Sequence, residues 1–348
     1  MREKVLQFLQ KEIDLEHIPG AVISVSYGGK TVMEEAIGYR SVYPNKLPMS
    51  LDTVFDLASL TKIVATLPSI LKLIDNGEIR LDDPISHFLP KFGQNGKEKI
   101  TIRHLLTHTS GLPAHKSYYA ENFSRNKIIE TIFAEELDHS PDQKVVYSDL
   151  GLIMLYKVIE KVTTQPFEQF TEEQLFKPLN MLCCGYNPSF SRERYAATEY
   201  SEKLNEYKCG VVHDENTEAM GGISGHAGLF STIKDLQNYA KMIENGGEFE
   251  GKQILSNVAL ALSKQNHTPF DTEYRGLGWV VKGQKLPACG DLFSSRSYGH
   301  TGFTGTSIWF DPDIDLHVIL LTNRVHYGRQ PHILRLRPRL HNIIRSYC

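Results

Sequence analysis

The spacing of hydrophobic positions changes along this chain. An amphipathic helix is predicted over roughly the first 18 residues, and a β-branched strand from Ala21 to Tyr27 follows it. A second strand near Lys30 to Glu35, reached through Gly28-Gly29, completes a predicted hairpin. Strand spacing returns late in the chain, with the turn Asp311-Pro312-Asp313 joining the last two predicted strands. These late strands are Leu277 to Val281, Thr306 to Phe310 and Leu316 to Thr322.

The middle of the chain, from Ser59 to about Thr217, has mainly helical spacing. Its first helix carries an apolar stripe that Asn76-Gly77 ends, and a terminal helix, interrupted by Pro338, closes the chain. Since the predicted strands lie near both ends, we predict an α/β domain built from residues 1–58 and 225–348 around a mainly helical domain of residues 59–224. Further helical segments are predicted at Leu81 to Pro84, Leu150 to Val162 and Phe167 to Leu175.

The composition is that of a globular protein with a large core and without a strong charge imbalance. With 348 residues, 41% of them hydrophobic, the chain can bury a large core. A net charge of -3 gives no reason to expect a nucleic acid or an anionic membrane as partner. The five cysteines are odd in number and form no Cys-x-x-Cys pattern, so reduced, mostly buried thiols are expected.

The N-terminal segment is interrupted by Gln10-Lys11-Glu12, which breaks the apolar region that a signal peptide needs. No apolar run of about 18 residues could span a bilayer. A cytoplasmic protein is therefore expected, although a chain from which a leader had been removed would look similar.

The most informative pair is Ser59 and Lys62. A hydroxyl and an amine three residues apart on a helix share one face, so the lysine nitrogen can reach the serine oxygen and receive its proton. Ser-x-x-Lys alone is usually a solvated helix surface. Here the apolar residues from Phe55 to Ala58 lead into the helix, which places Ser59 at the buried mouth of a core helix. Ser59 is therefore a candidate nucleophile.

Two later triplets, Tyr147-Ser148-Asp149 and His300-Thr301-Gly302, follow the Ser59 motif in order. With them the chain resembles the serine β-lactamase and penicillin-binding protein superfamily, specifically its class C β-lactamase, D-alanyl-D-alanine peptidase and family VIII esterase branch. The resemblance implies an α/β (α+β) fold, β-lactamase/transpeptidase-like, with an antiparallel sheet flanked by helices, an all-helical domain, and an active site in the cleft between them. Further similar segments are Ile102 to Leu112, Gln165 to Met181 and Gly225 to Thr232.

The same resemblance implies roles for the motif residues. Ser59 would form an acyl-enzyme, with Lys62 or Tyr147 as the base. Their ordinary pKa values are about 10.4 and about 10, so either group needs its surroundings to act as a base near neutral pH. The sequence leaves the choice between the two open.

The third motif is expected on an edge strand beside the site. In the resembling enzymes the cation and hydroxyl at positions like His300 and Thr301 hold a substrate carboxylate, and Gly302 lets substrate approach the backbone. Because histidine is partly neutral at pH 7, this attraction would be weaker than with lysine. The backbone N–H groups of Phe303 and Ser59 would form the oxyanion hole.

Asp149 departs from the family pattern, in which relatives acting on acylamino substrates usually have asparagine. An ionised aspartate only accepts hydrogen bonds, so it would repel a substrate amide carbonyl. Near Lys62 it would favour the ammonium form and shift the base role onto Tyr147. Penicillins with acylamino side chains are thus not expected as substrates. The alternative is that Asp149 caps the helix that follows it.

Several other residues are expected to be structural. His104 and His108 have metal-ligand spacing, but no acidic general base lies between them, and no metal or cofactor is expected. His213 and His226 lie in glycine-rich turns that could line the cleft, with buried histidines bonded to loop carbonyls as the alternative. Four arginines near the C-terminus are interpreted as a solvated basic face. They are Arg335, Arg337, Arg339 and Arg345.

Together these features predict a serine hydrolase that acts through an acyl-enzyme on a small-molecule substrate, either a small ester or a peptidoglycan-derived amide or peptide. A weak β-lactamase or D-alanyl-D-alanine carboxypeptidase is the second hypothesis. A catalytically silent penicillin-binding-like sensor or ligand-binding protein is the third, and the presence of Ser59, Lys62 and Tyr147 argues against it. The sequence contains no pattern that identifies the leaving group of the substrate or the oligomeric state of the protein.

Overall fold

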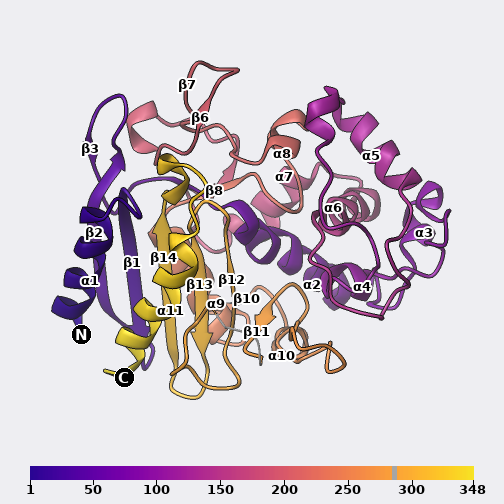
Figure 1. Ribbon diagram of the computed structural model, residues 1–348. Helices are drawn as coiled ribbons and strands as arrows, with labels where there is room; N and C mark the ends of the chain where they lie inside the picture. The colour runs from indigo at the N-terminus through magenta and orange to yellow at the C-terminus, as the bar shows by residue number, and fades with distance from the viewer. Residues whose placement is uncertain (284–287) are drawn as a thin grey trace.

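The computed structural model describes residues 1–283 and 288–348. Within them the main sheet has seven antiparallel strands in the order β11-β12-β13-β14-β1-β2-β3. Strand β14 pairs with β1, so the two ends of the chain meet in the middle of one sheet (Figure 1). The strands are β1 Gly20–Tyr27, β2 Lys30–Ser41, β3 Leu47–Pro48, β11 Val280–Val281, β12 Tyr298–Thr301, β13 Ser307–Asp311 and β14 Leu316–Thr322.

Helices cover both faces of this sheet. Helices α1 (Arg2–Asp14) and α11 (His332–Arg345) pack on one face, and α9 (Ile233–Glu244) packs against β1 and β14 on the other. Successive residues of a strand point to opposite faces, so Ile23 contributes to the first layer and Val22 to the second. Burial on both sides explains the nearly continuous apolar runs in these strands.

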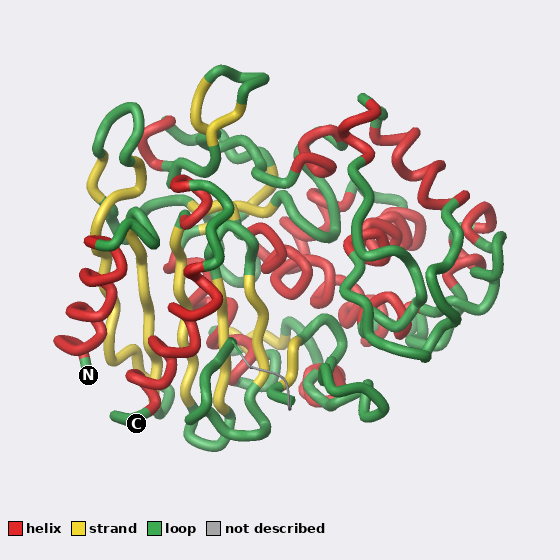
Figure 2. The backbone as a smooth tube through the Cα atoms, in the orientation of Figure 1, coloured by secondary structure: helices red, strands yellow, loops and turns green. Residues whose placement is uncertain are grey.

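A mainly helical region lies beside the sheet (Figure 2). Its central helix, α6, is surrounded by shorter helices, and α2 packs against it. The small helix α10 (Asn257–Ser263) contacts α2 from the sheet side. The helices of this region are α2 Leu67–Asp75, α3 Ile85–Phe88, α4 Ile102–Leu106, α5 Arg125–Ala134, α6 Asp149–Thr163, α7 Phe167–Thr171 and α8 Glu215–Ala219.

Short strands connect the two parts. Strands β4, β8 and β5 form a small sheet between them, and the pairs β6–β7 and β9–β10 form two-stranded ribbons. The β6–β7 ribbon projects from the top of the molecule in Figure 1. The bounds are β4 Phe55–Asp56, β5 Gly185–Tyr186, β6 Tyr200–Ser201, β7 Glu206–Tyr207, β8 Leu229–Ser231, β9 Glu248–Phe249 and β10 Lys252–Gln253.

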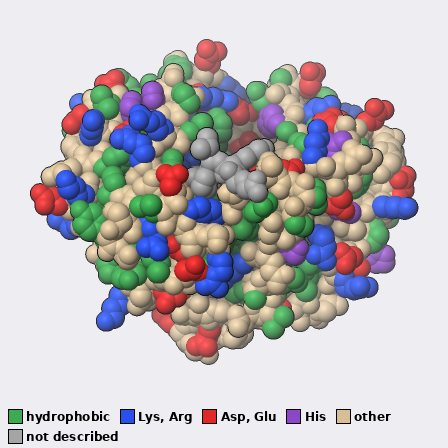
Figure 3. Space-filling model, turned by 60° about the horizontal axis from the view of Figure 1, so that its bottom comes forward, with side chains coloured by type: hydrophobic (Ala, Val, Ile, Leu, Met, Phe, Trp, Pro, Cys, Tyr) green, Lys and Arg blue, Asp and Glu red, His purple; other side chains and the backbone are tan. Residues whose placement is uncertain are grey.

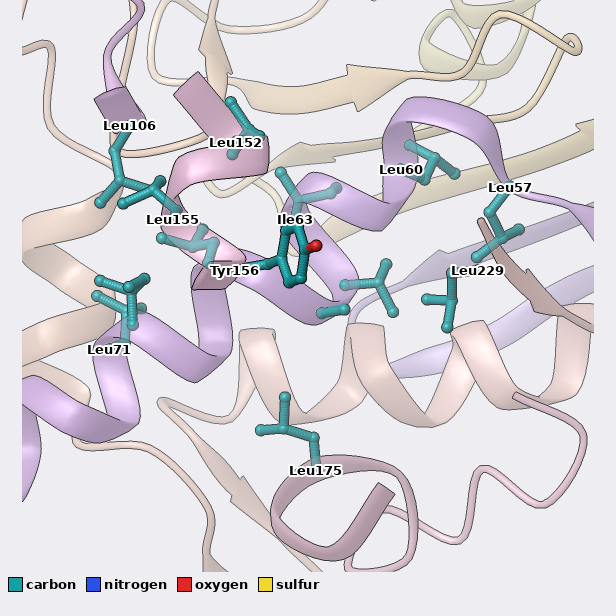
Figure 4. Packing of buried hydrophobic residues seen from close by; sticks show 14 of the residues in the cluster. Leu57, Leu60, Ile63, Leu71, Leu106, Leu152, Leu155, Tyr156, Leu175 and Leu229 are labelled. Carbon is teal, nitrogen blue, oxygen red and sulfur yellow. The ribbon is translucent and has the colours of Figure 1, made fainter. Parts of the chain in front are cut away.

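The segment that carries the first motif is not one regular helix. A 3₁₀ turn, Ala58–Leu60, is followed by a π-helical turn, Lys62–Thr66, before α2 begins. The core supports this irregular turn: the hydroxyl of Tyr239 donates to the carbonyl of Ile63 at 2.5 Å. The Ile63 side chain is packed among leucines and Tyr156 (Figure 4). Single π turns often occur at functional sites, and this one positions the residues just after Ser59.

Three expectations about secondary structure were wrong in detail. The segment Leu81 to Pro84 is not helical, because a proline disfavours helical geometry in the residue before it, and α3 begins only after Pro84. The strand predicted from Leu277 is reduced to β11, since Gly278 has a φ of 73°. Helix α11 continues through Pro338, so that residue does not interrupt it.

The surface matches the balanced composition. On the face shown in Figure 3, acidic and basic side chains are interspersed without a large area of one sign.

All five cysteines are free, but only Cys289 is fully buried, so the expectation of mostly buried thiols was wrong. None of the helices in the described residues is long and apolar enough to cross a membrane.

Candidate active site

Ser59 and Lys62 come together as their spacing predicts. The Lys62 Nζ lies 2.9 Å from Ser59 Oγ and also donates to the carbonyl of His226 at 3.0 Å. The Lys62 side chain is fully buried, whereas Ser59 lines an open cavity of about 480 Å³. The amine therefore approaches the serine from inside the protein and leaves the other side of the hydroxyl accessible to a substrate.

The third group at Lys62 is the Asp149 carboxylate, whose Oδ1 lies 2.8 Å from Nζ. Burial alone would lower the pKa of Lys62, but the charges of Asp149 and Tyr147 outweigh it and hold that pKa above its ordinary value. Burial would likewise raise the pKa of Asp149, but Lys62 and His115 hold it well below its usual range. Lys62 is thus an ammonium ion and Asp149 a carboxylate at neutral pH.

The alternative interpretation of Asp149 as a helix cap was wrong. Helix α6 begins at Asp149 itself, and the cap position belongs to Ser148, whose side chain makes no capping bond. The Ser148 hydroxyl instead donates to the carbonyl of Pro113. The second oxygen of Asp149 lies 3.7 Å from Nδ1 of the half-exposed His115. The carboxylate is therefore directed toward the site.

Tyr147 lies directly above the buried amine. The Lys62 Nζ is 4.9 Å from the centre of the tyrosine ring, and the guanidinium of Arg275 is 5.3 Å from it. His108 and His300 contact the ring at centroid distances of 4.5 and 5.9 Å. Two cations thus contact the ring of Tyr147.

His300 lies on β12, which is not the outermost strand. The outer strand β11 pairs only with Tyr298 and Gly299, so His300 and Thr301 have no strand partner on that side. The predicted open edge therefore exists only locally, beside the cavity. His300, Thr301, Gly302 and Phe303 all line that cavity.

The charge state of His300 differs from the expectation. Its Nδ1 donates to the carbonyl of Thr301 at 2.9 Å, and its buried Nε2 has no hydrogen-bond partner among the described residues. Burial and the nearby cations of Lys62 and Arg275 lower its pKa to about 3. At neutral pH His300 is therefore an uncharged acceptor and does not supply a cation for a substrate carboxylate.

Two buried arginines provide the positive charge instead. Arg275 is ion-paired to Glu273, yet its Nε and Nη1 have no partner among the described residues. Arg337, on α11, donates from Nη2 to the carbonyls of Gly302 and Thr306, both at 2.8 Å. Burial lowers the pKa of Arg337 to about 9. Both arginines line the cavity.

The interpretation of the C-terminal arginines as a solvated face was thus wrong for Arg337, which is 4% exposed. A signal for its burial was present in the sequence. Ile333 precedes it by four residues and Leu340 follows it by three, and both are buried. Helical spacing therefore places Arg337 on the apolar face of α11.

Gly302 allows β12 to approach the nucleophile turn. A Cβ at this position would lie 2.1 Å from Thr306 Oγ1 and 2.5 Å from the carbonyl oxygen of Leu57, so no other residue fits. The hydroxyl of Thr306 donates to that same carbonyl at 3.0 Å. The backbone N–H of Phe303, next along the chain, makes no hydrogen bond with another described residue. It is available as an oxyanion donor.

A buried carboxylate shapes the turn before Ser59. Asp56 accepts hydrogen bonds from the backbone N–H groups of Ala58 at 2.8 Å and His213 at 2.6 Å. Ala58 has a φ of 47°, a left-handed conformation that is unfavourable for residues other than glycine. The strained residue immediately before Ser59, the candidate nucleophile, is held by these contacts, and such strain is common at functional sites.

The four histidines expected to be structural have specific partners. His104 completes a capping box with Thr101 at the start of α4, and His108 accepts from the backbone N–H of Ser148. The partners of His213 and His226 are carboxylates, at 3.0 Å in both cases, and not the expected loop carbonyls. Those carboxylates are Glu199 and Asp214. No cluster of three potential metal ligands occurs among residues 1–283 and 288–348.

The sheet, the helical region and the three motifs around one cavity define the β-lactamase/transpeptidase-like fold. The chain belongs to the Beta-lactamase family, whose family model matches residues 6–341. It is 32% identical over 355 residues to a "Putative D-alanyl-D-alanine carboxypeptidase" of Salmonella enteritidis, with 92% of this chain and 82% of that protein covered. It is also 32% identical over 362 residues to the "N-acetylmuramyl-L-alanine amidase" of Bacillus subtilis, with 93% and 81% covered.

Solved structures agree on the fold. EstCE1, described as a hydrolase with promiscuous acyltransferase activity, has a TM-score of 0.77 at 22% identity, with 97% of this chain and 98% of that chain covered. The penicillin-binding protein homologue of Pyrococcus abyssi has a TM-score of 0.74 at 24% identity, with 95% and 75% covered. The protein is therefore a hydrolase of the Beta-lactamase family.

The buried neutral His300 should make the fold acid-sensitive. Between pH 6.5 and about 3 the unfolded chain binds a proton at this residue and the folded protein does not. Stability is therefore lost as pH falls through this window, by up to about 1.4 kcal/mol per pH unit. His300→Gln should reduce the loss of unfolding free energy between pH 7 and 5 by about 2 kcal/mol in urea titrations.

The matched control for this test is His87→Gln, at an exposed histidine of α3, which should behave as the wild type. Equal pH dependence in the wild type and His300→Gln would show that His300 is not held neutral by burial.

Removing the carboxylate at Asp149 should destabilise the protein, because it leaves the buried Lys62 ammonium without its charged partner. We expect Asp149→Asn to lower the free energy of unfolding by about 3 kcal/mol in denaturant titrations. The control is Asp142→Asn, which changes the hydrogen bond between the exposed Asp142 carboxylate and His104 Nε2 and should cost at most about 1 kcal/mol. Equal stability of the two variants would contradict the role given to the buried pair.

Proposed function

We propose that this protein is a serine hydrolase that forms an acyl-enzyme on Ser59 and cleaves an amide or ester bond in a peptidoglycan-derived fragment. The observation that carries this proposal is the 2.9 Å contact between the buried Lys62 ammonium and Ser59 Oγ. The names of the two curated relatives, a carboxypeptidase and an N-acetylmuramyl-L-alanine amidase, support the substrate class.

Acylation would begin with transfer of the Ser59 hydroxyl proton. Because Lys62 is already protonated, the neighbouring Tyr147 is the base in the proposed mechanism. Oγ then attacks the substrate carbonyl carbon, and the backbone N–H groups of Ser59 and Phe303 would donate to the developing oxyanion. As the tetrahedral intermediate collapses, the leaving amine or alcohol takes the proton from Tyr147.

Deacylation would use the same groups in reverse. Tyr147 accepts a proton from a water molecule, and the resulting hydroxide attacks the acyl carbon. The bond from carbon to Ser59 Oγ breaks, and the serine recovers the proton from Tyr147. Lys62 keeps its positive charge through both half-reactions and stabilises negative charge on the oxygens of Tyr147 and Ser59.

The polar groups of the cavity indicate which substrates fit. Arg275 lines the cavity and places a cation beside it, a charge that neutral His300 does not supply. Asp149 offers an acceptor where an acylamino carbonyl would need a donor. Asp149 therefore disfavours substrates with an acylamino group beside the scissile carbonyl, which include penicillins and acyl-D-alanyl-D-alanine peptides. A D-alanyl-D-alanine carboxypeptidase activity is thus the second candidate.

Covalent labelling tests the proposal directly. Intact-mass spectrometry of the wild type after exposure to a fluorophosphonate or a p-nitrophenyl ester should show one adduct, and Ser59→Ala should show none. The control Ser189→Ala, at an exposed serine, should react as the wild type does. Benzylpenicillin, which carries an acylamino side chain, should give little or no adduct.

A folded wild type that forms no Ser59-dependent adduct with either electrophile would contradict the hydrolase mechanism. That result would instead support the hypothesis of a catalytically silent ligand-binding protein. Efficient, Ser59-dependent acylation by benzylpenicillin would contradict the role of Asp149 while leaving the nucleophile assignment intact.

A further inference from the structure

A cluster of aromatic side chains surrounds a second cavity of about 420 Å³. We call Tyr43, Tyr200, Tyr207 and Tyr327 the tyrosine platform. They come from the loop between β2 and β3, the β6–β7 ribbon and the 3₁₀ turn Arg324–Tyr327, segments that gather at the top of Figure 1. The rings of Tyr43 and Tyr207 are stacked at 5.9 Å, and Tyr200 meets Tyr207 edge-on at 5.4 Å.

The platform is held in place by a buried histidine. His326 Nε2 accepts from the backbone N–H groups of Val42 and Tyr43, at 2.9 and 3.1 Å, and Nδ1 donates to the carbonyl of Thr198 at 3.0 Å. Its ring also packs on Tyr207 at 4.5 Å. Both ring nitrogens of the neutral His326 are therefore used, and they hold the backbone at Tyr43 while the ring supports Tyr207.

The platform combines exposed ring faces with unused polar groups. Tyr43 and Tyr200 are 47% and 46% exposed. Several polar side-chain groups at the cavity form no hydrogen bond with another residue in the described parts of the chain. They are the hydroxyls of Tyr43, Tyr207 and Tyr327, the carboxylate of Glu16 and the amide of Gln330.

This combination selects a particular kind of ligand. A purely apolar chain would leave the hydroxyls and the amide unpaired, and an anionic group would be repelled by Glu16. A pyranose ring has apolar C–H faces that can lie on aromatic rings and a rim of hydroxyls that can pair with phenol, amide and carboxylate groups. The cavity volume lies within the usual range for small-molecule sites, about 300–1,000 Å³.

The platform is connected to the nucleophile through shared lining residues. Glu199 and Tyr200 line both the platform cavity and a neighbouring cavity of about 650 Å³, which Arg329 also lines. Arg329 lies 2.8 Å from Glu199 and lines the cavity that contains Ser59 as well. The platform cavity and the Ser59 cavity thus both adjoin the intervening cavity, and the paired side chains of Arg329 and Glu199 lie at its two junctions.

We propose that the tyrosine platform binds a neutral pyranose unit of the substrate, so that the protein acts on peptides still attached to a glycan. This inference deepens the proposed function and rests on it for the identity of the substrate. It assigns substrate preference to Tyr43 and Tyr200, which lie outside the residues that carry out the chemistry.

Ligand-observed NMR titration of Ser59→Ala with N,N′-diacetylchitobiose tests the platform without requiring catalysis. We expect saturable binding that weakens about fivefold or more when Tyr43→Ala or Tyr200→Ala is added. Tyr43→Phe, which keeps the ring, should weaken binding less. Tyr347→Ala, at an exposed tyrosine near the C-terminus, should leave binding unchanged.

Absence of saccharide binding, or equal binding in the Tyr43→Ala and Tyr347→Ala variants, would overturn the platform proposal. This result is separate from the test of the proposed function, because the saccharide contains no scissile amide or ester. If the wild type forms the Ser59 adduct and the Ser59→Ala variant does not bind the saccharide, the hydrolase proposal stands and the glycan-binding proposal is wrong.

Discussion

The buried ion pair between Lys62 and Asp149 is the interaction on which the rest of the site depends. It joins the turn that carries the nucleophile to the first residue of α6, and the same ammonium also binds the carbonyl of His226. Removing two charges from water is costly, so such a pair contributes more to a unique arrangement than to net stability. Here it fixes the amine 2.9 Å from Ser59 Oγ and keeps it protonated. In the proposed mechanism the base is therefore Tyr147 and not Lys62.

Close approach of the sheet to that turn is the second constraint. Gly302 allows β12 to lie against Leu57, and Thr306 binds the Leu57 carbonyl from the sheet side. The burial that results makes His300 neutral and places Arg337 behind the strand, where it binds the carbonyl of Gly302. The positive charge at the cavity therefore comes from Arg275 and Arg337, which lie outside the motif, and not from His300.

Much of this arrangement could be predicted from the sequence, because it follows from local patterns. The apolar, β-branched runs of β1 and β14, and the spacing of Ser59 and Lys62, need no knowledge of distant residues. The burial of Arg275 and the neutral state of His300 could not be predicted, since both depend on which segments pack around them. The π-helical turn after Ser59 was missed for the same reason: its carbonyls are satisfied by groups far away in the chain, such as the hydroxyl of Tyr239.

Titration of Lys62 shows whether this residue is an ammonium ion held by Asp149. In protein labelled with ¹³C-lysine, the Lys62 signal can be identified by its loss in Lys62→Arg and followed by NMR as the pH rises. We expect no titration of this signal below the ordinary lysine pKa of about 10.4. A midpoint near neutral pH would contradict this expectation, because Lys62 would then be free to act as the base itself.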